Sequence, residues 1–136
     1  MKKWFFLLAM IPILGFSQHR LTVMVEGVKS SEGNISIGLY NQVDGFLKPE
    51  KGFLGLSVKA VKGTTTALIE NLPYGSYAIA VFHDENGNQK MDTNFFGIPK
   101  EAMGFSKGKL KTFGPPSYKE CAFSFTGDME VKVPIE

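Results

Sequence analysis

The chain has 136 residues, a single cysteine and a formal net charge of +2 at pH 7. A chain of this length makes one domain with a core of its own, and the lone Cys121 excludes an intramolecular disulfide. The small net charge gives no electrostatic argument for nucleic acid or an anionic membrane as a partner.

Residues 1–17 have the layout of an export signal, in which a charged start precedes an apolar run and small residues precede the cut. Lys2 and Lys3 supply the charge, and residues 4–14 supply the run, which is too short to cross a bilayer comfortably. Without these two lysines the 15 basic residues fall to 13 and equal the 13 acidic ones. We therefore expect residues 18–136 to form one neutral, exported domain, periplasmic or secreted, with no transmembrane span after cleavage.

Alternation of apolar and polar residues between turn signals predicts a series of short β-strands in the first half of this domain. The expected strands cover residues 21–28, 33–41, 56–62, 64–72 and part of 73–84. The first two are expected to pair as antiparallel neighbours, because only a short turn-like segment joins them. In the fifth, Tyr77, Ile79 and Val81 line one side, whereas residues 42–55 show no clear period and predict a loop or a short helical turn.

Residues 84–119 show neither a helical nor an alternating period and contain many glycines and prolines. A structureless segment of this length is uncommon in a small domain, so we expect another feature to order it. Residues 121–135 then predict two strands around the turn at Gly127 and Asp128, with Cys121 as a buried, unreactive thiol in the first. About seven short strands and no amphipathic helix predict an all-β fold, an antiparallel β-sandwich of the immunoglobulin-like or prealbumin-like kind with one long ordered loop.

The stretch FHDENGNQKMDTN at residues 82–94 places acidic and amide side chains at every second position after a buried strand. Calcium needs several oxygen ligands, and a tight loop offers them when carboxylates and amides recur in this way. In an EF-hand-like frame, side-chain ligands fall at positions 1, 3, 5 and 9, and a main-chain carbonyl falls at position 7. These positions are occupied by Asp84, Asn86, Asn88 and Asp92, and by Lys90. The sequence therefore predicts a calcium loop at residues 84–92.

The frame is incomplete, because Gln89 stands where a glycine is usual and Phe95 stands where a bidentate glutamate belongs. A bound ion would then take a further ligand from elsewhere, with an affinity in the weak extracellular class of about 0.1–1 mM. The acidic residues considered for this role are Glu85, Glu101 and Asp128. The alternative is a polar turn at the Asn-Gly pair, in which the acidic residues are only solvated.

Residues 95–105, with the sequence FFGIPKEAMGF, concentrate apolar side chains in the predicted loop. One interpretation is a surface for a ligand or protein partner. Its candidate residues are Phe95, Phe96, Met103 and Phe105. The alternative is a satellite core that covers one edge or end of the sandwich. An apolar pocket beside this loop would favour a small-molecule or glycan-binding protein.

His83 directly precedes the predicted calcium loop and permits a third hypothesis, a transthyretin-like hydrolase with His83 and Asp84 as catalytic groups. The other histidine, His19, lies beside the predicted cut, so the sequence assembles neither a zinc triad nor a Ser-His-Asp set. The hydrolase hypothesis requires His83 to face a cleft. The alternative is a histidine at a strand end that is hydrogen-bonded into the loop.

The order of LPYGSYAIAVFHDENGNQKMDTNFFGIPKEAMGFS and FGPPSYKECAF resembles the bacterial exported family DUF2141, from about Leu21 to Ile135. The resemblance implies a small exported domain of Gram-negative bacteria and brings no activity, substrate or catalytic residue with it. The family has an NGNG-type turn where this chain has Gln89. We therefore expect a non-enzymatic sandwich whose calcium loop orders the aromatic segment for an unidentified small ligand or protein.

Overall fold

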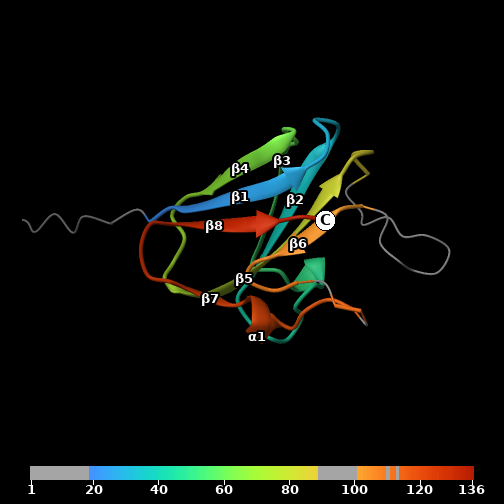
Figure 1. The fold of residues 1–136 in the computed structure, drawn as a ribbon. Coiled ribbons are helices and arrows are strands. Elements are labelled where there is room, and N and C mark those ends of the chain that lie inside the picture. Colours follow the sequence, from blue (N-terminus) through green and yellow to red (C-terminus); the bar gives the residue numbers. More distant parts are fainter. Residues whose placement is uncertain (1–18, 89–100, 110, 113) are drawn as a thin grey trace, which may run out of the picture.

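A computed structural model describes residues 19–88, 101–109, 111–112 and 114–136 (Figure 1). The predicted export signal at residues 1–17 lies outside this part of the chain. The described residues form eight strands, a 3₁₀ turn (η1, Pro49–Lys51) and a short helix (α1, Tyr118–Cys121). The strands are β1 (Leu21–Val28), β2 (Asn34–Tyr40), β3 (Leu54–Lys59), β4 (Gly63–Ile69), β5 (Gly75–Asp84), β6 (Met103–Phe105), β7 (Phe123–Phe125) and β8 (Met129–Pro134). The predicted all-β fold is confirmed, with eight strands described against about seven expected.

The strands form two sheets that pack face to face as a sandwich (Figure 1). One sheet has the order β4-β1-β8, and the other has the order β3-β2-β5-β6, with β7 also paired to β5. On one side the sheets are joined, because the main-chain N–H and C=O groups of Met103 and Glu136 exchange two hydrogen bonds of 3.0 Å. The edge strands β3 and β4 therefore lie on the opposite side.

The predicted pairing of residues 21–28 with 33–41 is wrong. β1 pairs with β4 and β8, whereas β2 pairs with β3 and β5, so the intervening loop carries the chain from one sheet to the other. Both strands bury alternate residues in one shared core from opposite sides, and alternation does not say which sheet a strand joins. The sandwich also departs from a fully antiparallel one, because β1 and β8 run parallel.

The main core fills the space between the sheets with the inward residues of both. β1 contributes Val23 and Val25, and β2 contributes Ile37 and Leu39, all of them almost completely buried. The expectation that Tyr77, Ile79 and Val81 of β5 share one side is confirmed, because all three belong to this core. Burial of side chains of this size is worth about 1.5–3 kcal/mol each, so the core is the main source of stability.

A second, smaller core lies on the outer face of the five-stranded sheet. It contains Tyr40 and Ala78, a cross-strand pair of β2 and β5 whose side chains alternate with those of the main core. Phe105, Tyr118 and Cys121 pack on this pair. Cys121 is buried as predicted, although it ends α1 and does not lie in a strand. The described part of the expected long loop is thus held by a satellite core, one of the two interpretations of its apolar residues.

No helix in the described part of the chain is both long and apolar enough to cross a membrane.

Candidate functional site

The end of β5 delivers Asp84 into a tight turn. The carbonyl oxygen of Asp84 accepts a hydrogen bond of 3.4 Å from the N–H of Gly87, whose φ of +69° lies in the left-handed region that favours glycine. Asp84 also stands opposite Asn34 of β2 in the ladder, and its side chain is only 1% exposed. The first predicted ligand therefore belongs to the buried end of a central strand.

The side chains at the first and third positions of the predicted frame converge. The N–H of Asn88 donates to Oδ1 of Asp84 at 3.2 Å and to Oδ1 of Asn86 at 3.1 Å. The Asn88 nitrogen thus draws the Oδ1 atoms of Asp84 and Asn86 toward the same point of the turn. This is the arrangement that a loop needs if its side-chain oxygens are to share one cation.

The remaining residues of the frame cannot be placed. Lys90 and Asp92 lie outside the described residues, as do Gln89 and Phe95. Within the described part of the chain, no three His, Cys, Asp or Glu side chains gather as a metal site. The described turn thus supplies three oxygen-bearing side chains of the predicted set, those of Asp84, Asn86 and Asn88.

The structure separates the three acidic residues considered as a further ligand. Glu85 is next to Asp84 in the chain. The N–H of His83 donates to the carbonyl oxygen of Ala102, so the pairing of β5 with β6 continues beyond Phe82 and Met103. The next residue along, Glu101, therefore lies beside the end of β5. Asp128 lies at the other end of the sandwich, where it accepts a hydrogen bond from the N–H of Arg20 before β1 begins. The eight residues of β1 span about 26 Å, which excludes Asp128 from this site.

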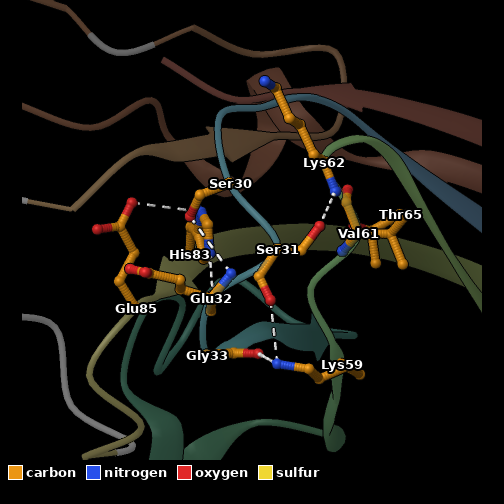
Figure 2. A network of polar contacts seen from close by, with 10 residues as sticks. All are labelled: Ser30, Ser31, Glu32, Gly33, Lys59, Val61, Lys62, Thr65, His83 and Glu85. Atoms are coloured by element: carbon orange, nitrogen blue, oxygen red, sulfur yellow. Dashed lines mark hydrogen bonds and ion pairs between the residues drawn. The ribbon is translucent and has the colours of Figure 1, made fainter.

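The loop between β1 and β2 packs directly against this turn. Gly33 has a φ of +66°, and a Cβ there would lie 2.0 Å from the carbonyl oxygen of Asp84. The imidazole Nε2 of His83 donates to the carbonyl oxygen of Glu32 at 2.7 Å, and its Nδ1 lies 3.7 Å from a carboxylate oxygen of Glu85 (Figure 2). Residues 30–33 and the end of β5 therefore form one connected unit.

Polar contacts from β3 and its connection to β4 fix the other side of the same loop (Figure 2). The ammonium group of Lys59 donates to the carbonyl oxygens of Ser31 and Gly33, at 3.0 and 3.3 Å. The N–H of Lys62 donates to Oγ of Ser31 at 2.9 Å. The sequence indicates the turn at Gly33 but gives no sign of the contacts of Lys59. The partners of Lys59 are main-chain carbonyls that lie far from it in the sequence.

His83 does not have the exposure that the hydrolase hypothesis requires. Its side chain is 1% exposed, and its Nε2 is occupied by the Glu32 carbonyl, so it faces a neighbouring loop and not a cleft. His83 lies at a strand end and is hydrogen-bonded to a loop, as the alternative expects, but that loop joins β1 to β2 and is not the 84–92 loop.

The apolar segment is only partly described, because Phe95 and Phe96 lie outside the described residues. Met103 and Phe105 form the ends of β6 instead of lying in a loop. Phe105 is 2% exposed and belongs to the second core, which corrects its assignment to a ligand or partner surface. Three residues are too few for alternation to be seen in the sequence, which is why β6 was not predicted.

Two pKa shifts bear on reactive groups near this second core. Burial raises the pKa of the Cys121 thiol, against a smaller opposing effect of a hydrogen bond from the Gly108 main chain. Burial, and to a lesser degree the negative charge of Glu50, raises the pKa of the Tyr40 phenol. Both groups are therefore neutral near pH 7, and Cys121 is not an activated nucleophile.

The comparisons with known proteins are consistent with the sequence resemblance. The model of the family DUF2141, described as an uncharacterized protein conserved in bacteria, matches residues 23–133. No curated protein and no solved structure matches the chain. The immunoglobulin-like or prealbumin-like character of the sandwich accordingly stays a prediction.

Proposed function

The chain belongs to the bacterial family DUF2141, and we propose that this member is an exported, non-enzymatic β-sandwich whose 84–92 loop binds calcium as a structural ion. The ion orders the segment that follows, up to β6, for contact with a small ligand or a protein partner. Localisation in the periplasm or outside the cell is part of the proposal, because it rests on the export-like character of residues 1–17.

The observation that carries the proposal is the convergence of Asp84 and Asn86. Their Oδ1 atoms share the N–H of Asn88 as a donor, so residues 84–88 already curl and bring two potential ligands toward one nitrogen. A calcium ion holds its oxygens at 2.3–2.6 Å, which requires them to gather closely in this way. Glu101, beside Asp84 across β5 and β6, is the preferred source of a further carboxylate.

The position of Asp84 supports a structural role for the ion. Asp84 is almost fully buried at the end of a central strand, so its carboxylate is fixed to the framework of the sheet. A cation at this carboxylate would stabilise the strand end and the turn together. It would also stabilise the loop at residues 30–33, which packs on the same turn.

The test compares thermal unfolding of chelator-treated protein with and without calcium. For a dissociation constant of about 0.1–1 mM, about 2 mM calcium stabilises the native state by on the order of 1 kcal/mol, which is a rise of several degrees in the midpoint. Asp84→Asn keeps the shape of the side chain and removes its charge, so this variant should lose most of the rise.

Asp128→Asn is the matched control, because Oδ1 of Asp128 also accepts a main-chain hydrogen bond, from Arg20, but at the other end of the sandwich. It should keep the full response to calcium. Equal midpoints for the wild-type protein with and without calcium would refute the proposal and identify the segment as a polar turn.

A further inference from the structure

The strand β3 forms an open edge of the five-stranded sheet. Among the strands that the structure describes, its one neighbour is β2, to which it pairs in an unbroken register from Asn34↔Lys59 to Leu39↔Leu54. The main-chain groups on the outer side of such a strand are a template for another strand. We propose that β3 is a self-association edge, where two copies of the chain pair β3 with β3 in antiparallel orientation about a two-fold axis.

The hydrogen-bonding pattern identifies which main-chain groups would join the copies. The N–H of Ala60 donates to the carbonyl oxygen of Gly33 at 3.2 Å. Directly bonded pairs recur at every second residue of an antiparallel ladder. Val58 and Leu56 therefore direct their N–H and C=O groups toward β2, whereas Gly55, Ser57 and Lys59 direct theirs away from it. These outward groups have the alternating donors and acceptors that only an extended strand matches.

The apolar side chains of β3 show why a second copy fits. Leu54, Leu56 and Val58 stand opposite Leu39, Ile37 and Ile35 in the β2 ladder, so they lie on the side of the main core. Their partners in β2 are buried, yet Leu54 is 39% exposed and the other two are only half-buried. A two-fold axis perpendicular to the sheet keeps this face on the same side in both copies. The half-buried apolar row of one copy then meets the same row of the other.

The edge lacks the usual features that prevent such pairing. Its sequence, LGLSVK, has no proline and a single charge, on Lys59. That ammonium group is drawn back to the carbonyl oxygens of Ser31 and Gly33 in its own chain. The other open edge, β4, differs because a bulge interrupts its pairing with β1 between Glu26 and Val28, and bulges turn an edge away from pairing.

Charge and the outer face also permit the antiparallel arrangement. Glu50 precedes β3 and Lys59 ends it, so antiparallel copies bring the carboxylate of each toward the basic end of the other. On the outer face, no described residue lies within 4 Å of a Cβ built at Gly55, which leaves room for side chains of the second strand. One six-residue strand per copy buries less than about 1,200 Å² in total, so we expect a weak, concentration-dependent dimer.

The test is sedimentation equilibrium of the full chain from about 10 μM to about 1 mM, a range suited to an interface of this size. We expect a monomer–dimer equilibrium. Ser57→Pro removes an outward N–H without touching the β2 ladder, and Ser57→Lys brings two like charges together near the axis. Each should raise the dissociation constant by about tenfold or more. Should Ser57→Pro fail to fold by circular dichroism, Ser57→Lys decides alone.

Leu68→Lys is the control, because it places the same charge on the exposed side of β4, the other edge strand. Its dimer should be as stable as that of the wild-type protein, and amide exchange of Gly55, Ser57 and Lys59 should slow as concentration rises. A wild-type protein that is monomeric over the whole range would overturn the proposal. So would a dimer that both Ser57 variants leave unchanged, or one that only Leu68→Lys disrupts.

Discussion

The imidazole of His83 donates a hydrogen bond of 2.7 Å to the carbonyl oxygen of Glu32 and so joins the end of β5 to the loop that links the two sheets. The two residues are 51 positions apart in the chain. The bond holds the predicted calcium turn and the inter-sheet loop in one unit, and it gives the buried histidine a structural role.

Replacement of His83 tests this structural role. His83→Phe keeps a planar ring but leaves the Glu32 carbonyl without its donor, which should destabilise the protein by about 0.5–1.5 kcal/mol. Glu85→Gln should change stability by less than about 0.5 kcal/mol, because the Glu85 side chain is about half exposed and lies 3.7 Å from the ring. Urea unfolding of both variants measures the difference. Equal stability of His83→Phe and the wild-type protein would contradict the role of the bond.

Gly33→Ala should be one of the most damaging small substitutions in the chain. A Cβ at Gly33 would lie 2.0 Å from the Asp84 carbonyl oxygen, at a φ of +66°. Gly87 has nearly the same φ, +69°, but no described residue lies within 4 Å of a Cβ built there. Gly87→Ala should therefore lower the free energy of unfolding only by the backbone cost of about 1–2 kcal/mol. Gly33→Ala should lower it by the same backbone cost and, in addition, by the cost of the steric clash.

The comparison uses denaturant unfolding of the two alanine variants in chelator, so that calcium plays no part. If they lose equal stability, the close approach of Gly33 to Asp84 does not matter and backbone conformation explains the whole effect.

Ser106 is a fully buried hydroxyl that joins two segments of the second core. Its Oγ accepts from the N–H of Ile79 at 2.8 Å and donates to the carbonyl oxygen of Cys121 at 2.7 Å. Ser106→Ala leaves both main-chain groups buried without this partner, and each such group costs about 1–3 kcal/mol. Ser124→Ala, on the exposed face of β7, is the control and should be nearly neutral. Thermal unfolding that does not distinguish the two variants would count against this role.

The sequence predicted the all-β class and most strand positions because those properties depend on local alternation. Tyr77, Ile79 and Val81 could be assigned to one face from their spacing alone. The same alternation did not reveal that β1 and β2 belong to different sheets, because both sheets bury alternate residues in the same core. Pairing depends on contacts between distant segments, such as those of β1 with β8 at the end of the chain.

The candidate site was predictable only in part, for a related reason. Asp84, Asn86 and Asn88 could be identified because calcium loops impose a local spacing on their ligands. The contacts of Lys59 with the carbonyls of Ser31 and Gly33 leave no mark in the sequence, since any residue type supplies a carbonyl. Phe105 was assigned to a surface because a three-residue strand is too short to show a period.

The Cys121 thiol should be unreactive in the folded protein and should make stability depend on pH in the alkaline range. Burial raises its pKa in the folded state above the value of about 8.5 for an exposed thiol. The buried neutral thiol therefore contributes stability that is fully present below the unfolded pKa and is lost as pH rises through the folded pKa. Ionisation of Tyr40 and Tyr77, whose pKa values burial also raises, acts in the same direction.

Cys121→Ala isolates the thiol, because both tyrosines are present in the variant and in the wild-type protein. The wild-type protein should lose more unfolding free energy than Cys121→Ala between pH 8 and about pH 10. Iodoacetamide at pH 8 should label Cys121 in urea and leave it unlabelled in buffer. Parallel pH profiles of the two proteins, together with rapid labelling of the native state, would show that the thiol is accessible and not shielded by burial.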